Sequence, residues 1–116
     1  MTSVLTMSIG GNQMAEHPLK ILEKIDPELL KHVGDANAFA LAEGALPRRI
    51  KFLIAMALDA AHGTVEGTKS LAEQAMKAGA TKEEIVETIR VAQLVSGVGS
   101  VYVAARAFRE LFLTGP

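Results

Sequence analysis

The chain has 116 residues and contains no cysteine. This absence excludes disulfide bonds, thiolate nucleophiles, zinc sites with cysteine ligands and iron–sulfur clusters. Charge of one sign is also lacking, because 12 lysines and arginines face 13 aspartates and glutamates. A protein of this size that binds nucleic acid needs a basic surplus to displace counterions. We therefore expect no nucleic-acid partner, and the sequence predicts neither a cofactor nor a metal site.

Long apolar runs are missing as well. No run reaches the ~18 residues that span a bilayer, and residues 1–14 lack the basic start and apolar centre of a signal peptide. We expect a cytoplasmic protein without a membrane partner. Hydrophobic residues nevertheless make up 49% of the chain, and the mean hydropathy of +0.25 is high for so small a domain. This surplus favours subunit contacts and predicts a homo-oligomer.

Two regions differ in pattern. Residues 1–16 mix small polar residues with isolated apolar ones at no constant period, which predicts a flexible N-terminal arm. Residues 17–116 show no sustained period of two, and helix-start and helix-stop residues recur along them. The sequence therefore predicts a single all-α domain of five to six helices.

Individual signals place these helices. Pro18 and the segment 26–28 (DPE) each predict a helix start. The helix from residue 26 ends before Gly44, either as one bent helix or as two shorter ones, because Gly34 weakens it by ~1 kcal/mol relative to alanine. The segment 81–84 (TKEE) is a capping box that follows a predicted left-handed cap at Gly79.

The helix that follows Pro47 carries one predicted apolar stripe, formed by Ile50, Leu53, Ile54, Ala57, Leu58 and Ala61. Two glycines and two β-branched residues predict a break over 63–67. After the capping box, residues 85–95 are apolar around more than one side, which predicts a helix buried on several faces. A glycine turn at 97–99 precedes the last helix.

The run from Leu46 to Phe112 resembles the carboxymuconolactone decarboxylase and alkyl hydroperoxidase D superfamily. The matching segments are 46–49 (LPRR), 53–57 (LIAMA), 78–85 (AGATKEEI) and 104–111. The resemblance implies a compact all-α fold that assembles into trimers or hexamers.

The resemblance also implies which chemistry is missing. The peroxidase branch of this superfamily uses a C-x-x-C pair, a histidine four residues later and a glutamate on the preceding helix. The corresponding positions here are Thr64, Gly67, Leu71 and Phe52. A hydroxyl with no adjacent base cannot replace a thiolate, so thiol peroxidase activity is rejected. The cysteine-free decarboxylase branch is the nearer one, although its histidine also corresponds to Leu71.

His62 and Glu66 are the candidate catalytic residues. In a continuous helix, Asp59, His62, Glu66 and Lys69 would share one face and form an acid–base or weak metal cluster. The same four residues are better explained as the solvated face of an amphipathic helix, and the break over 63–67 argues against a continuous face. His17 and His32 are interpreted as ordinary exposed residues.

Arg48 and Arg90 are the candidate substrate-binding residues. Arg48 lies in the first turn of its helix, where the dipole disfavours a cation unless an acidic neighbour or a bound anion is present. Arg90 lies between apolar residues and needs a carboxylate or a ligand. The sequence thus predicts a non-redox protein that binds a small anionic organic molecule, with decarboxylase-like lyase chemistry as an option. The alternative is an inactive assembly module, in which Phe52 and Leu71 fill the former site.

Overall fold

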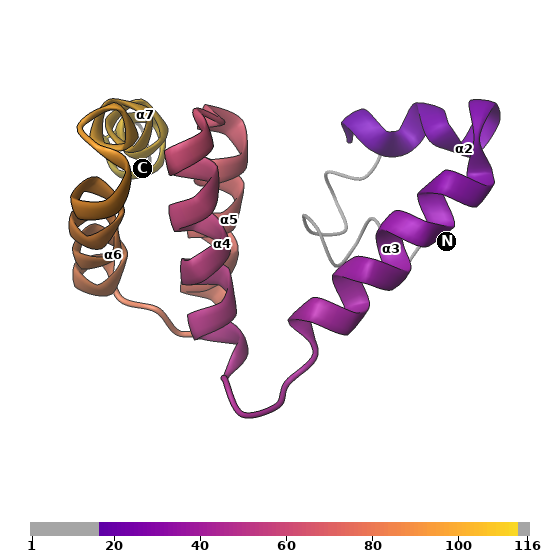
Figure 1. Ribbon diagram of the computed structural model, residues 1–116, viewed down its shortest axis with the longest axis horizontal. Coiled ribbons are helices and arrows are strands. Elements are labelled where there is room, and N and C mark those ends of the chain that lie inside the picture. The colour runs from indigo at the N-terminus through magenta and orange to yellow at the C-terminus, as the bar shows by residue number, and fades with distance from the viewer. Residues whose placement is uncertain (1–16, 114–116) are drawn as a thin grey trace. The chain divides into compact units, whose positions relative to one another are not determined.

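The structure is a computed structural model that describes residues 17–113, so the predicted arm at 1–16 lies outside the described part of the chain. Contacts divide the protein into two units, Met1–Ala42 and Glu43–Pro116, and we describe each by itself. The described residues form six α-helices and no strand, which confirms the all-α prediction (Figure 1). That residues 17–116 form one domain stays a prediction.

The first unit contains the short 3-10 helix η2 (Pro18–Ile21) and the helices α2 (Leu22–Ile25) and α3 (Pro27–Leu41). Both predicted starts are capped: His17 Nδ1 accepts a hydrogen bond from the Leu19 amide at 3.1 Å, and Asp26 Oδ1 accepts one from the Leu29 amide at 3.0 Å. Helix α3 runs through Gly34 without a break, so the single-helix alternative holds.

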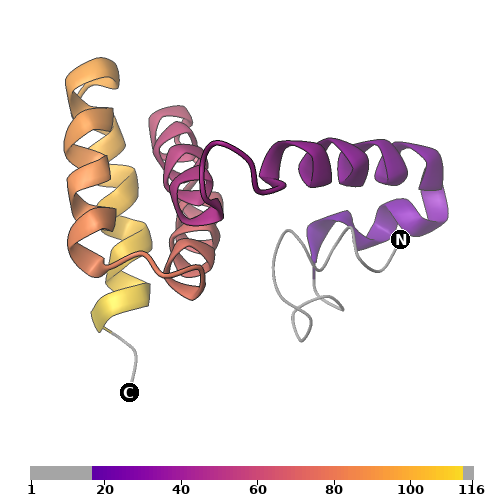
Figure 2. The same ribbon diagram turned by 90° about the horizontal axis from the view of Figure 1, so that it is seen from below.

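The second unit contains α4 (Arg48–His62), α5 (Val65–Lys77), α6 (Lys82–Ser96), α7 (Gly99–Phe108) and a closing π-helical turn, η3 (Arg109–Leu113). Within it, α4 packs beside α5 and α6 beside α7 (Figure 2). Three glycines with positive φ, Gly63, Gly79 and Gly97, lie at the helix ends and allow reversals that other residues rarely adopt. The predicted cap at Gly79 is therefore confirmed.

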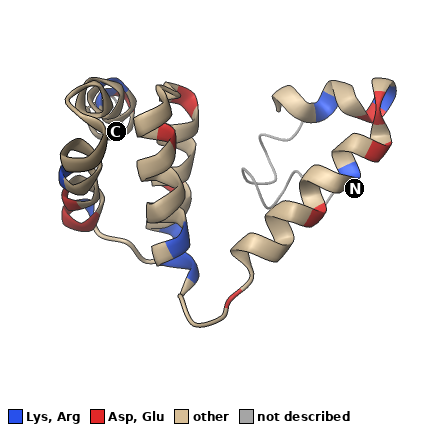
Figure 3. Cartoon of the chain, in the orientation of Figure 1, with Lys and Arg blue, Asp and Glu red and all other residues tan. Residues whose placement is uncertain are grey.

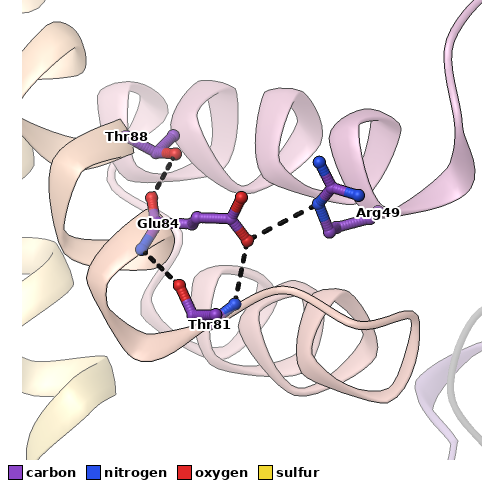
Figure 4. Close-up of polar contacts among 4 residues, drawn as sticks. All are labelled: Arg49, Thr81, Glu84 and Thr88. Carbon is purple, nitrogen blue, oxygen red and sulfur yellow. Dashed lines mark hydrogen bonds and ion pairs between the residues drawn. The ribbon is translucent and has the colours of Figure 1, made fainter.

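The capping box at the start of α6 forms as predicted. The Glu84 amide donates to Thr81 Oγ1 at 3.1 Å, and the Thr81 amide donates to Glu84 Oε1 at 2.9 Å (Figure 4). The same carboxylate lies 3.5 Å from Arg49 Nε in the first turn of α4. A local helix cap thus also joins the beginnings of α4 and α6.

The predicted stripe on α4 is wrong in part. Leu53 is buried, but Ile54 and Leu58 are 46% and 55% exposed, and the buried face is completed instead by Phe52, Met56 and Ala60. Helix α4 carries apolar residues around much of its circumference, so periodicity does not choose between two overlapping faces. Packing against α5, α6 and α7 makes that choice.

Helix α6 is not buried on several faces within one chain, contrary to the prediction. It buries Ile85, Ile89 and Ala92, whereas Val91, Leu94 and Val95 are exposed. The second unit has too few helices to surround α6, and its outer side therefore stays uncovered.

Replacing Thr81 tests the capping box. Thr81→Ala removes the acceptor for the Glu84 amide, and we expect the free energy of unfolding to fall by about 1 kcal/mol. Thr64→Ala is the matched control, because Thr64 is the N-cap of α5 but its side chain makes no capping bond. Urea denaturation of both variants measures the difference, and equal losses would contradict the assignment.

Candidate functional site

The four residues predicted to form a site lie in three places. Arg48 is in the first turn of α4, and His62 is the last residue of the same helix. The 14 residue steps from Arg48 to His62 correspond to ~21 Å along the axis. Glu66 is in the first turn of α5, close in sequence to His62, and Arg90 is on α6. The structure therefore does not gather them into one cluster.

The turn between α4 and α5 is shorter than the predicted break over 63–67. Gly63, with φ of 88°, ends α4, the Thr64 amide donates to the Asp59 carbonyl at 2.9 Å, and α5 begins at Val65. Because this reversal ends the helix, the continuous face proposed from the sequence does not form. Lys69, a member of that face, pairs with Glu110 at 3.3 Å.

The weak metal cluster is not supported by the structure. Among residues 17–113, no three histidine, aspartate or glutamate side chains come close enough to hold a metal ion. The side chains of His62 and Glu66 are both exposed at the surface. Among residues 17–113, no hydrogen bond or ion pair joins His62 to Asp59, although the charge of His62 acts on the pKa of the Asp59 carboxylate.

Asp59 is the residue that sequence reasoning undervalued. Its carboxylate packs so closely on Gly67 that a Cβ atom there would overlap Asp59 Oδ2. Partial burial raises the pKa of Asp59, and the nearby His62 acts in the opposite direction and lowers it. In the sequence, the only sign of this contact is Gly67 in the first turn of α5. The reason for a glycine there becomes clear only when Asp59 is seen to pack against it.

The positions equated with the peroxidase residues have other roles here. Phe52 belongs to the buried core and Leu71 is half-buried. Thr64 is the N-cap of α5, and the space beside Gly67 is taken by the Asp59 carboxylate. Asp59 thus occupies the volume that a side chain at position 67 would need.

The arginines at the start of α4 have different environments. Arg49 has an acidic neighbour, Glu84 at 3.5 Å, although the geometry is that of an ion pair rather than a hydrogen bond. The guanidinium of Arg48 lies 5.3 Å from the centroid of the Phe52 ring, and its buried Nε has no hydrogen-bond partner. Packing on an aromatic face is sufficient to place this cation.

Arg90 is exposed, whereas the sequence suggested that apolar neighbours would enclose it. It borders a cavity of about 270 Å³ between α6 and α7. The cavity is lined by Val86, Ile89, Arg90, Gln93, Val101, Ala104, Ala105 and Phe108. Arg90 also borders a second, more polar hollow of about 380 Å³, lined by Lys82, Glu83, Val86, Glu87 and Arg90.

No ion pair to Arg90 is found in the described part of the chain. Ion pairs among residues 17–113 join other side chains, among them Lys20 with Glu23, Lys31 with Asp35, Arg49 with Glu84, and Lys69 with Glu110. Figure 3 shows basic residues at the start of α4 and acidic residues toward the end where α4 turns into α5. The cation beside the α6–α7 cavity and the acidic turn are therefore separate features.

Comparison with protein families supplies the identity of the fold. The family described as "Carboxymuconolactone decarboxylase family" matches residues 27–110, from the start of α3 into η3. The chain belongs to the carboxymuconolactone decarboxylase family. Searches of curated proteins and of solved structures found no match. The family match confirms the resemblance inferred from the sequence. Because the chain contains no cysteine, it has no thiol of its own to reduce a peroxide.

No helix between residues 17 and 113 of this family member is long and apolar enough to cross a membrane.

Gly67→Ala tests the packing of Asp59. The added Cβ would overlap the carboxylate and lie 3.0 Å from the Thr64 methyl group. Overpacking of this kind costs about 1–3 kcal/mol, against a gain of about 1 kcal/mol in helix propensity. We expect a net loss of stability in urea denaturation.

The same substitution in an Asp59→Ala background provides the control, because the obstructing carboxylate is gone. Because only the contact with the Thr64 methyl group remains there, we expect Gly67→Ala to cost clearly less stability than it does in the wild-type background. Gly44→Ala, at a glycine with open space around it, reports the cost of a methyl group with no neighbour. A stabilising Gly67→Ala in the wild-type background would show that Asp59 does not occupy this position.

Proposed function

We propose that this carboxymuconolactone decarboxylase family member binds a small organic anion in the α6–α7 cavity, with Arg90 as the contact for the anionic group. The observation that carries the proposal is a guanidinium with no ion pair in the described residues, at the edge of an apolar cavity. This deepens the expectation from the sequence and moves the site away from His62, Glu66 and Arg48.

The size and lining of the cavity limit the ligand. About 270 Å³ is slightly below the ~300–1000 Å³ typical of ligand pockets, which favours a molecule of few atoms over a nucleotide. Six of the eight lining residues are apolar, so the ligand body is apolar too and gains ~25 cal/mol for each Å² removed from water. Phe108 offers an aromatic surface, and the Gln93 amide offers one further polar contact.

The chemistry of arginine favours a carboxylate as the anionic group. A guanidinium stays charged at all physiological pH values and presents paired N–H donors that match the two oxygens of a carboxylate. It does not release a proton, and Arg90 is the one ionisable residue of this cavity. We therefore propose that the cavity binds the anion and does not by itself catalyse a reaction. A lyase step would need a proton donor that does not line this cavity.

Arg90→Met tests the anion contact with benzoate and hexanoate as probes. The substitution keeps an unbranched apolar side chain and removes the charge, and a charge-assisted hydrogen bond is worth about 1.5–3 kcal/mol. We expect the Kd to rise about 10- to 100-fold, measured by NMR titration. Arg106→Met is the matched control, because Arg106 is an exposed arginine of α7 that does not line the cavity.

Benzamide serves as the neutral analogue in the same titration. We expect it to bind wild-type protein more weakly than benzoate and to be insensitive to Arg90→Met. Equal loss of affinity in the two arginine variants would contradict the proposal, as would equal binding of benzoate and benzamide.

A second candidate function, assembly, is favoured by a different observation. Residues 91–105 contain no charged residue. On the outer side of α6 and α7 this stretch exposes an apolar face, with Leu94 85% exposed. The members of this α6–α7 apolar face are Val91, Leu94, Val95, Val98 and Tyr102.

We propose that a second copy of the chain covers the α6–α7 apolar face. Exposed apolar groups of this kind favour association because contact removes them from water. Since the face carries no charged side chain, association does not have to bury an unpaired charge. The resemblance implies a trimer or a hexamer. Because α6 and α7 also form the cavity, ligand binding and assembly draw on the same two helices.

Leu94→Asp tests the assembly. We expect wild-type protein to exceed the monomer mass of 12.3 kDa in size-exclusion chromatography with light scattering, and the variant to shift toward that mass. The exposed position predicts little change in helix content by circular dichroism. Leu58→Asp, at an exposed leucine of α4, is the control. A monomeric wild-type protein, or a variant of unchanged mass, would overturn the proposal.

A further inference from the structure

The cavity and the α6–α7 apolar face lie on the same two helices, and Arg90 lines the cavity where the two meet. We infer that an organic anion bound at Arg90 promotes self-association of the chain through this face, so that the ligand regulates assembly. The inference rests on the proposed anion site and on a second copy of the chain as the partner. It adds a coupling between the two and gives the sign of that coupling.

The first argument is that the cavity lining and the apolar face are continuous. Residues three or four positions apart are neighbours on the surface of a helix. On α6, Leu94 of the apolar face follows the cavity residue Arg90 by four positions. On α7, Tyr102 of the apolar face precedes the cavity residue Ala105 by three. The apolar face therefore begins where the lining of the cavity ends.

The second argument is that the cavity is open toward this side. Three residues of its lining, Arg90, Gln93 and Ala105, are exposed. Ligand pockets bury about 70–90% of the surface of a drug-sized molecule. A second copy seated on the apolar face lies beside the opening and removes more of the bound molecule from water, which strengthens binding. The cavity is thus completed by the partner.

The third argument gives the sign of the coupling. Within residues 17–113 Arg90 has no ion pair, so a guanidinium without a partner borders the apolar face. Association without a ligand brings this charge into a contact that is partly shielded from water, and burying an unpaired charge is unfavourable. A carboxylate bound at Arg90 pairs the charge before the two surfaces meet. The anion therefore favours association.

Helices α6 and α7 run in opposite directions along this surface (Figure 2). Lys82 Nζ at the start of α6 lies 5.1 Å from the centroid of the Phe112 ring in η3, which continues α7. The turn between Ser96 and Gly99 joins the other two ends. The beginning of α6 and the end of α7 therefore lie together, at the end of the helix pair that is farther from the turn.

Exposed charges of both signs lie at that end. Glu83 and Glu87 precede Leu94 by eleven and seven positions, which places all three on one side of α6. Arg109 follows Tyr102 by seven positions and lies on the same side of α7. Both glutamates and Arg109 are exposed, and none of them has an ion pair in the part of the chain that the structure describes. The surface thus has an apolar end and an end with unpaired charges.

This surface is complementary to itself, which favours a second copy as its partner. A copy rotated by 180° about an axis parallel to the helices places α6 of one chain over α7 of the other and apolar end on apolar end. Glu83 and Glu87 of each chain then face Arg109 of the other, and opposite charges that face each other favour the correct partner. Each contact occurs twice, as in an isologous dimer, and a hexamer with two-fold axes contains such contacts.

Analytical ultracentrifugation with and without benzoate tests the coupling. We expect saturating benzoate to lower the dissociation constant of the assembly about 10-fold, within the roughly 5- to 150-fold range usual for coupled sites. Because such coupling is reciprocal, the Kd of benzoate in NMR titrations falls as the protein concentration is raised. Benzamide has no charge to pair with Arg90 and leaves the dissociation constant unchanged.

Arg90→Met tests the sign of the coupling. This variant lacks the unpaired charge, so we expect it to associate more strongly than the wild type without benzoate and to show no response to benzoate. Lys77→Met is the control, because Lys77 is an exposed cation at the end of α5, outside α6 and α7. It keeps the association and the benzoate response of the wild type.

A charge exchange tests the partner. Arg109→Glu and Glu87→Arg each place like charges opposite one another, and we expect each to weaken association about 5-fold, as for an exposed charge pair. The double variant restores opposite charges and recovers most of the loss. All three keep the benzoate site, because neither residue lines the cavity.

The outcomes separate the coupling from the anion site itself. If benzoate binds but leaves the dissociation constant of the assembly unchanged, the coupling is overturned and the anion site stands. If wild-type protein binds no benzoate, the anion site is wrong and the coupling falls with it. The coupling is also overturned if Arg90→Met associates no more strongly than the wild type without benzoate, and a double variant that stays as weak as the single ones overturns the two-fold partner.

Discussion

The reversal of the chain at Gly63 is the constraint on which the second unit depends. It returns α5 along α4 after a two-residue break, so that the face made by Phe52, Met56 and Ala60 is covered. The positive φ at Gly63 makes this reversal possible without strain. The same turn sets Asp59 against Gly67 and leaves His62 exposed at the helix end. The same turn therefore sets both the burial of this face of α4 and the close contact of Asp59 with Gly67.

Charge distinguishes the α6–α7 cavity from the α4–α5 turn. Arg90 places a cation without an ion pair among residues 17–113 beside an apolar cavity, which suits an organic anion. The α4–α5 turn instead carries the acidic residues Asp59 and Glu66. The sequence hypothesis had joined His62, Glu66, Arg48 and Arg90 into one pocket. The folded chain divides them, because the ends of a 15-residue helix lie too far apart for one small molecule to touch both.

Much of the helical layout could be predicted because its signals are local. The Thr81 capping box, the Asp26 cap and the glycine turn at Gly79 each involve residues within a few positions of one another. The choice of buried face on α4 could not be predicted, since Ile54 and Phe52 are both apolar and periodicity allows either to face inward. The outer face of α6 was misjudged for a related reason: apolar composition alone does not say whether a helix is covered by its own chain or by another.

The sequence by itself determined the all-α class, the helix caps at Asp26 and Thr81, the resemblance to the family and the absence of a thiol, because these depend on residue type and short-range spacing. Tertiary structure alone decided that Asp59 meets Gly67 and that Arg90 borders a cavity without an ion-pair partner among the described residues. Such relations depend on how whole helices pack, and a side chain eight positions away along the sequence becomes a neighbour only after the chain has reversed.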